Sequence, residues 1–158
     1  MPASSSRRWL LAMAGLCVAA VAAALLSQHV FGLQPCPWCI LQRLVFLLIA
    51  LACLVAAFAP ALLRKGLAAL ALLLAAGGVA AAVHQHVVAS KSSSCALTLA
   101  DKILTALGVE SLAPWLFQVT ATCADAAVDL FGVPYEYWSL AVFVALGVGA
   151  IRVLSMRR

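Results

Sequence analysis

Four long apolar stretches constrain the fold of this chain more than any other feature of its sequence. They cover about residues 9–26, 40–59, 67–88 and 137–154, and none of them contains an acidic residue. A helix of about 20 mostly apolar residues is long enough to cross the hydrocarbon core of a membrane. Because backbone polar groups in lipid must be satisfied within the segment, we predict an all-α membrane protein built as a four-transmembrane-helix bundle.

The composition agrees with a chain that uses lipid as part of its solvent. Of its 158 residues, 66% are hydrophobic and 9% are charged, whereas soluble domains carry about 25% charged residues. The alternating pattern of a membrane β-barrel is absent. No linker or second domain is visible, so we expect residues 1–158 to form a single integral membrane domain.

The distribution of charge predicts how the four spans are oriented. One side of a four-span arrangement collects most of the basic residues: Arg7, Arg8, Arg64, Lys65, Arg152, Arg157 and Arg158. The other side holds every acidic residue: Asp101, Glu110, Asp125, Asp129 and Glu136. The positive-inside rule then places both termini in the cytoplasm and two loops, about 27–39 and 89–136, in the periplasm of a bacterial inner membrane. The net charge of +5 therefore reflects topology, and we expect no nucleic-acid partner.

The first span also resembles a secretory signal, because Arg7 and Arg8 precede its apolar run. The run is longer than a usual signal core, and residues 27–29 offer no clear processing site. Leu16 is too large for the position before Cys17 in a lipoprotein signal. We therefore expect a retained helix.

The second outward loop is too long to be a simple connection, and loops of this length are usually functional or disordered. Residues 97–104 have a crude helical spacing, and residues 112–117 form an apolar cluster around Trp115. Such a segment suits a short helix lying in the membrane interface. A loop that packs its own apolar residues is the alternative, and the two interpretations are compatible.

The six cysteines divide into two groups by position. Cys17 and Cys53 lie deep inside spans one and two, where a thiol behaves as a small apolar group, and we predict no role for them. The other four face the outward, oxidising side, where cysteines normally pair: Cys36, Cys39, Cys95 and Cys123. Four cysteines allow three pairings, and the spacing alone does not choose among them.

The segment Cys36-Pro37-Trp38-Cys39 has the spacing of a redox motif. Two residues between the thiols permit a tight ring, and such rings often contain a thiol of depressed pKa. Half of a zinc site is the alternative interpretation. Haem attachment is excluded, because Ile40 stands where a histidine is required. The motif opens span two, where helix amide groups favour a negative charge, so the redox interpretation is preferred.

Arg43 follows Cys39 by one helical turn, at the depth of the membrane boundary. A charge at this depth is costly and suggests function, although the side chain could instead snorkel to lipid headgroups. The sequence contains no nucleotide or flavin fingerprint and no cluster of metal ligands, so we predict a membrane quinone, ubiquinone or menaquinone, and no metal site. We expect Cys39, Arg43 and His86 to bind it. Weaker candidates are Gln42, His29 and His84.

Cys95 and Cys123 are the candidates for exchange with another protein. Cys95 follows the small polar segment 91–94, which suits the approach of a partner. Loop disulfides are more often structural staples. The neighbouring redox motif favours an exchange role through mixed disulfides.

Taken together, these features resemble the DsbB family. The resemblance rests on the four spans, the Cys36–Cys39 motif followed by Gln42-Arg43, and the pair Cys95/Cys123. It extends to residues 115–123, to Phe131-Gly132-Val133-Pro134 and to Trp138-Ser139-Leu140, and so covers nearly the whole chain. It implies a quinone-linked thiol oxidase that reoxidises a periplasmic thioredoxin-fold protein of the DsbA type.

The resemblance also implies a role for each outward cysteine. Cys95 would be attacked by the reduced donor protein, and Cys123 would be its partner. Cys36 would exchange with this loop pair, and Cys39 would be the thiolate that meets the quinone, with Arg43 holding the ring.

Two positions refine this comparison. His86 resembles the family's histidine near the end of span three. Gln42 occupies a place where some relatives carry an acid. The long loop is also Ser-rich before Cys95. Neither Gln42 nor this loop removes a reacting group, but either could tune the choice of partner.

Other classes of protein remain as alternatives. A reductase or isomerase of the vitamin K epoxide reductase type also has four helices, but its quinone-side cysteine pair lies late in the chain. A metal-binding protein would prefer closely spaced ligand pairs, whereas Cys95 and Cys123 are far apart. A structural membrane protein with two inert disulfides is the third alternative.

Overall fold

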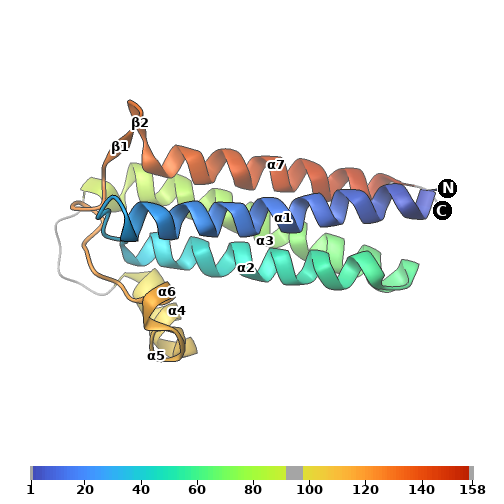
Figure 1. Ribbon diagram of the computed structural model, residues 1–158, viewed down its shortest axis with the longest axis horizontal. Coiled ribbons are helices and arrows are strands. Elements are labelled where there is room, and N and C mark those ends of the chain that lie inside the picture. Colours follow the sequence, from blue (N-terminus) through green and yellow to red (C-terminus); the bar gives the residue numbers. More distant parts are fainter. Residues whose placement is uncertain (1, 92–97, 157–158) are drawn as a thin grey trace.

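The computed structural model describes residues 2–91 and 98–156. Four long helices run side by side and alternate in direction, which gives an elongated bundle (Figure 1). Each of them is long and apolar enough to cross a membrane. The predicted all-α bundle of four transmembrane helices is therefore confirmed, and the helices extend a few residues beyond most of the ends expected from the sequence: α1 (Pro2–His29), α2 (Pro37–Phe58), α3 (Ala61–Val87) and α7 (Tyr135–Ser155).

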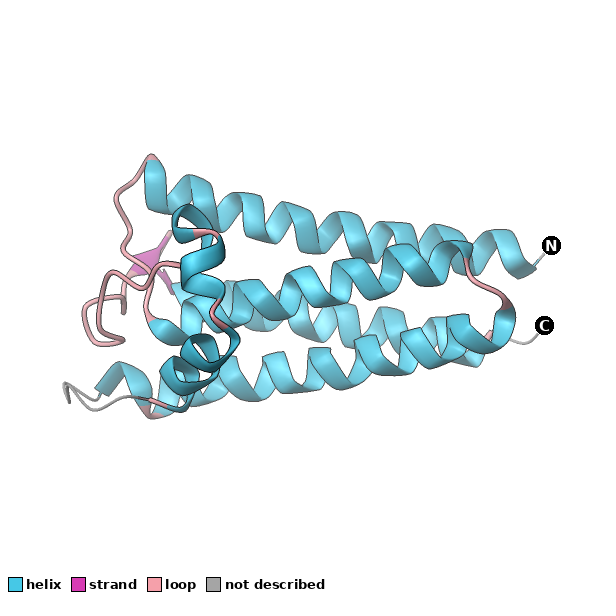
Figure 2. Ribbon diagram, turned by 90° about the horizontal axis from the view of Figure 1, so that it is seen from below, coloured by secondary structure: helices cyan, strands magenta, loops and turns pink. Residues whose placement is uncertain are grey.

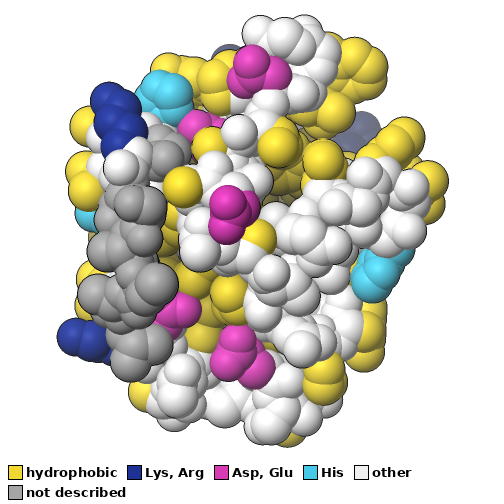
Figure 3. Space-filling view, turned by 90° about the vertical axis from the view of Figure 1, so that its left-hand side faces the viewer, with side chains coloured by type: hydrophobic (Ala, Val, Ile, Leu, Met, Phe, Trp, Pro, Cys, Tyr) yellow, Lys and Arg dark blue, Asp and Glu magenta, His cyan; other side chains and the backbone are white. Residues whose placement is uncertain are grey.

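The two ends of the bundle differ in what they carry. Both termini and the short α2–α3 connection lie at one end, and the remaining loops lie at the other (Figure 1). At the first end, the guanidinium of Arg7 lies over the ring of Phe58 and that of Arg152 lies over Trp9. The loop-bearing end shows acidic side chains spread among mostly uncharged surface (Figure 3). This asymmetry is the basis of the predicted orientation in the membrane.

Helix α2 begins where its local sequence requires. Cys36 has an extended backbone and acts as the N-cap, and its sulfur accepts a hydrogen bond from the backbone N–H of Cys39. Pro37 stands at the start of the helix, where its missing N–H removes no bond. The redox motif thus forms the cap and first turn of a membrane helix.

The core of the bundle is built from small residues and one aromatic stack. Phe46 of α2 and Phe143 of α7 stack with ring centroids 4.1 Å apart. Gly78 of α3 lies against Phe143 so closely that a Cβ there would overlap its ring. Cys17 and Cys53 are buried in this same cluster, among apolar side chains.

The long loop folds into an arm of short helices beside the end of α2. The arm consists of α4 (Leu99–Leu107), α5 (Val109–Leu112) and α6 (Pro114–Phe117), and a 3-10 turn at Ala89–Lys91 follows α3. Figures 1 and 2 both show the arm at the end opposite the termini. Leu104 and Phe117 pack on Ile40 of α2, which ties the arm to the helix that carries the redox motif.

A small hairpin, absent from our sequence predictions, connects the arm to α7. Its strands are β1 (Asp129–Leu130) and β2 (Val133–Pro134), which pair antiparallel. Helix α7 begins directly after it, so Glu136 lies in the first helical turn and is buried. Helix α7 starts two residues before the expected span, so Glu136, which the sequence assigns to the loop, is part of the helix.

Candidate redox site

Three sulfur atoms meet at the loop-bearing end of α2. The sulfurs of Cys36 and Cys39 are 2.8 Å apart, as unbonded thiols. The Cys36 side chain also makes a hydrogen bond with Cys123, whose sulfur accepts a second one from the backbone N–H of Trp38. Cys36 is fully buried and lies between the other two cysteines. Cys95 lies outside the described residues.

The hydrogen bond between Cys36 and Cys123 sets the charge of the pair. It lowers the pKa of Cys123, because the Cys36 thiol stabilises the Cys123 thiolate, and the Trp38 N–H adds to this effect. The same contact raises the pKa of Cys36, and burial raises it further. Cys36 therefore keeps its proton while Cys123 gains thiolate character, which is the reactive form of a cysteine.

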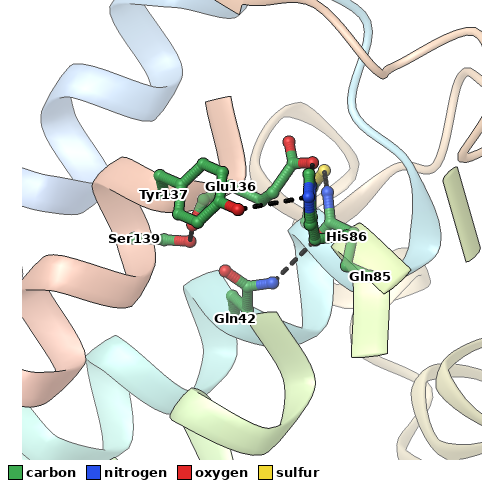
Figure 4. A network of polar contacts seen from close by, with 7 residues as sticks. Gln42, Gln85, His86, Glu136, Tyr137 and Ser139 are labelled. Carbon is green, nitrogen blue, oxygen red and sulfur yellow. Dashed lines mark hydrogen bonds and ion pairs between the residues drawn. The ribbon is translucent and has the colours of Figure 1, made fainter. Parts of the chain in front are cut away.

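Two glutamines orient the sulfur of Cys39. The amide of Gln85 in α3 donates to the Cys39 sulfur at 3.3 Å, and the amide of Gln42 donates to the Gln85 oxygen at 2.7 Å. Both glutamines are buried, and Figure 4 shows the chain that they form. Sequence analysis named Gln42 only as a weak candidate and missed Gln85. A polar residue directly before His86 in an apolar helix was the available signal.

Arg43 is buried at the same end of the bundle and links three elements. One terminal nitrogen donates to the side-chain oxygen of Gln28 at 2.7 Å and to the carbonyl of Leu116 at 3.1 Å. The other terminal nitrogen donates to the carbonyl of Ala24 at 3.3 Å. Its Nε has no hydrogen-bond partner among the described residues. Nor does any carboxylate in that part of the chain form an ion pair with Arg43.

A cavity of about 600 Å³ lies beside these groups, bounded by α1, α2, α7 and the loops. Its wall is mostly apolar, as expected for a site that binds an organic molecule. The buried polar side chains that line it are Ser27, Gln42, Arg43, Gln85 and Glu136, and the half-buried Cys39 lines it as well. The structure therefore places two of the three predicted quinone-binding residues, Cys39 and Arg43, at one cavity.

His86, the third predicted residue, reaches this cavity only through a neighbour. Its Nδ1 lies 2.7 Å from a carboxylate oxygen of Glu136, and its Nε2 lies 3.2 Å from the hydroxyl of Tyr137 (Figure 4). Glu136 lines the cavity, whereas His86 is not among the lining residues. Sequence analysis did not single out Glu136. A lone acid at the start of a membrane helix was the signal for it.

The two weaker histidine candidates lie elsewhere. The ring of His84 packs on Trp38 with centroids 4.5 Å apart. His29 ends α1. Neither lines the cavity. Within residues 2–91 and 98–156, no three His, Cys, Asp or Glu side chains are placed to hold a metal ion.

These features define a class of protein: a multi-pass membrane protein with a thiol cluster at the end of its helices, next to an apolar cavity. Comparison with known proteins gives the family. The family model described as "Disulfide bond formation protein DsbB" matches residues 6–153. The chain therefore belongs to the DsbB family of disulfide bond formation proteins, and it is a multi-pass protein of the bacterial inner membrane.

Curated relatives agree over most of the chain. Disulfide bond formation protein B 1 of Pseudomonas aeruginosa is 36% identical, with 98% of each chain covered. The protein of the same name in Pseudomonas entomophila is 37% identical over 87% of this chain and 83% of the relative. Disulfide bond formation protein B of Herminiimonas arsenicoxydans is 33% identical over 91% of this chain and 92% of the relative.

Proposed function

We propose that this protein reoxidises a periplasmic dithiol protein of the DsbA type and passes the electrons to membrane quinone, either ubiquinone or menaquinone. In the overall reaction the donor's two thiols become a disulfide, losing two electrons and two protons. The quinone gains two electrons and two protons and becomes a quinol. The observation that carries this proposal is that Cys39 faces the apolar cavity while its neighbour Cys36 contacts Cys123 of the loop.

The three-sulfur cluster supports a relay between two cysteine pairs. Disulfides exchange when a thiolate attacks a sulfur through a mixed disulfide. Cys36 contacts Cys39 on one side and Cys123 on the other, so a bond to either requires little movement of the chain. We assign electron flow from the donor to Cys95–Cys123, then to Cys36–Cys39, and finally to the quinone.

The cavity supports a quinone as the acceptor. Arg43 lines the cavity and offers a buried positive charge with no carboxylate partner in the described chain, and a charged N–H group is a strong donor to a carbonyl oxygen. Ala20 and Ala23 of α1 and Val142 of α7 contribute apolar surface to the lining. A quinone supplies the two-electron acceptor, while Arg43 binds and orients its ring and the apolar wall accommodates its tail.

The arrangement also argues against the two other classes. In a zinc site the Cys36–Cys39 sulfurs would point toward further ligands around one metal position. Here the Cys39 sulfur accepts a hydrogen bond from the side-chain amide of Gln85, and an N–H donor is not a zinc ligand. A purely structural disulfide does not require a buried arginine or a cavity next to it, and both are present here.

The orientation follows from the charges at the two ends. We place both termini and the basic residues around Arg7 and Arg64 in the cytoplasm. The redox cysteines and the arm then lie in the periplasm, where a soluble donor protein can reach them.

The test uses the purified full-length protein in detergent. Reduced thioredoxin-fold donor protein and a water-soluble quinone analogue are added, and quinone reduction is followed by absorbance. We expect reduction that is abolished in Cys39→Ala and in Cys95→Ala. The matched control is Cys53→Ala, which removes a buried thiol far from the cluster and should leave the rate unchanged. If quinone stays oxidised with several donors and both quinone types, the proposal fails.

A further inference from the structure

The proposed reaction leaves one requirement that the cysteines do not meet. Two electrons reach the quinone through Cys39, and the two quinone oxygens also take up two protons. The oxidised thiols release two protons, but Cys39 is the one cysteine of the described residues that lines the cavity. A protein group must therefore bring protons from the aqueous side to the acceptor. This inference rests on the proposed function.

Two carboxylates line the cavity, and they differ in their surroundings. Asp125 is exposed, and its carboxylate accepts a hydrogen bond from Thr122 within its own turn. Glu136 is 5% exposed and is held in the first turn of α7. A carboxyl group that lies in a cavity wall and away from bulk water suits general acid work, because it delivers its proton to a bound molecule rather than to solvent.

Glu136 is connected to the outside by a histidine. His86 Nδ1 is 2.7 Å from the Glu136 oxygen, and the His86 side chain is 39% exposed. Its other nitrogen lies 3.2 Å from the hydroxyl of Tyr137, a residue that is itself 41% exposed. The imidazole therefore has one nitrogen on the buried carboxylate and the other beside an exposed hydroxyl. A histidine so placed can take a proton at one nitrogen and release one from the other.

We propose that Glu136 is the proton donor of this site and that His86 reloads it. The O–H bond of the Glu136 carboxyl breaks, and its proton goes to an oxygen of the reduced acceptor. The Nδ1 proton of His86 then moves to the Glu136 carboxylate while water, directly or through the Tyr137 hydroxyl, gives a proton to Nε2. Exchange with water then returns the ring proton from Nε2 to Nδ1, and a second pass follows. The two passes supply the two protons of the quinol, while the Cys36 and Cys39 thiols release their own two protons to water as their disulfide forms.

The competing explanation is an ion pair that only holds α3 to α7. That pair would contribute to stability, and its loss would leave the rate of proton delivery unchanged in the folded fraction. The other ionisable groups that line this cavity are Cys39, Arg43, Asp125 and Tyr135. Asp125 is the matched control, because it is a second carboxylate on the same wall without a histidine contact.

The experiment compares the wild-type protein with Glu136→Gln, His86→Ala and Asp125→Asn in detergent. Reduction of a quinone analogue by the prereduced protein is followed in a single turnover. We expect Glu136→Gln to slow this step about 100-fold, as for loss of a general acid. His86→Ala should also be slow and should recover when imidazole is added, and Asp125→Asn should stay within twofold of the wild type.

Three further measurements do not depend on the reduction of quinone. The affinity of the oxidised protein for the quinone analogue, and the rate at which reduced donor protein reduces its disulfides without quinone, should be unchanged in Glu136→Gln. Nitrogen-15 spectra of the quinone-free protein should show a shifted His86 Nδ1 resonance in Glu136→Gln and an unshifted one in Asp125→Asn.

The outcomes separate the proton route from the proposed function. A wild-type protein that never reduces quinone overturns both. A wild-type protein that reduces quinone, with Glu136→Gln within twofold of its rate, overturns only the proton route. The proton route is also overturned if Glu136→Gln loses affinity for the analogue in proportion to its rate, or if imidazole fails to restore His86→Ala.

Discussion

The packed core of the bundle and its loop-bearing end use the same four helices for opposite purposes. In the core, small residues bring the helices together, and the stacked rings of Phe46 and Phe143 fill the space near the middle of α2 and α7. At the other end, the helices leave a cavity of about 600 Å³ and direct polar side chains into it. Buried polar groups require partners, and a cavity gives up packing contacts, so this end is the less stable one.

The cysteines of the packed core differ from those at the loop-bearing end. Cys17 and Cys53 are buried in the core, and neither forms a hydrogen bond to another sulfur among the described contacts. Cys36 and Cys123, by contrast, are buried in contact with each other and have altered proton affinities. Burial therefore does not distinguish an inert thiol from a reactive one. The neighbouring polar groups make that distinction.

The largest loss of stability should follow from adding a side-chain atom to the packed core of the bundle. Gly78→Ala places a methyl group into the buried ring of Phe143, which is held in turn by Phe46. Overpacking of this kind costs about 3 kcal/mol at the upper end of its usual range. The free energy of unfolding in detergent, measured by titration with a denaturing detergent, should fall by about that amount.

The neighbouring glycine is the control for this substitution. Gly77 has no atom within 4 Å of the position its Cβ would occupy, so Gly77→Ala should leave stability unchanged or slightly higher. If the two variants lose equal amounts of free energy of unfolding, the close contact between α3 and Phe143 is not what stabilises the packed core.

At the functional end, the next largest effect should follow from Arg43→Met. The substitution keeps an unbranched apolar stem and removes the charge and all three hydrogen bonds. Hydrogen bonds to charged groups contribute about 1.5–3 kcal/mol, so the affinity for a quinone analogue should fall about 10- to 100-fold. Fluorescence titration of the oxidised protein measures this affinity.

Arg64 offers a matched control at the opposite end. It also donates to backbone carbonyls, those of Ala56 and Ala59, but lies beside the α2–α3 connection. Arg64→Met should reduce stability without changing the affinity for the analogue. An affinity loss in Arg64→Met as large as in Arg43→Met would contradict the assignment of Arg43 to the acceptor site.

The sequence predicts the membrane helices and the cysteine motif better than it predicts the polar residues around the cavity. Apolar stretches of about 20 residues specify membrane helices almost by themselves, and the spacing of Cys36 and Cys39 is a local pattern. Gln85 and Glu136 could not be assigned in this way, because their roles depend on which helix ends meet in space. The sequence assigns Glu136 to a loop, because the hairpin directly before α7 has a two-residue turn, Phe131-Gly132, that does not match the usual Asn-Gly pattern.

A smaller effect should follow from removing the hydrogen bond to Cys39. Gln85→Leu keeps the approximate size of the side chain and deletes the donor to the sulfur. The loss of one hydrogen bond to a charged group is about 1.5 kcal/mol, which corresponds to about a tenfold slower alkylation of Cys39. The rate is measured on reduced protein in which the other five cysteines are alanine.

Gln42→Leu separates the direct contact from the supporting one. Gln42 bonds to Gln85 and makes no bond to the sulfur itself, so its loss should slow the alkylation of Cys39 less than the loss of Gln85. Alkylation that is slower in Gln42→Leu than in Gln85→Leu would mean that the chain of amides does not act through Gln85.

The smallest effect concerns the hairpin that positions Glu136. Phe131 and Gly132 form its two-residue turn with φ values of 57° and 77°, and Phe131 is 89% exposed. Turns with two positive φ angles favour Asn-Gly, and a bulky side chain in this conformation costs about 1 kcal/mol. Phe131→Asn should therefore raise the free energy of unfolding by about that amount, while Gly132→Ala, which introduces the same strain at the next position, should lower it. A loss of stability in Phe131→Asn would mean that the exposed ring contributes more through its surroundings than the turn costs in strain.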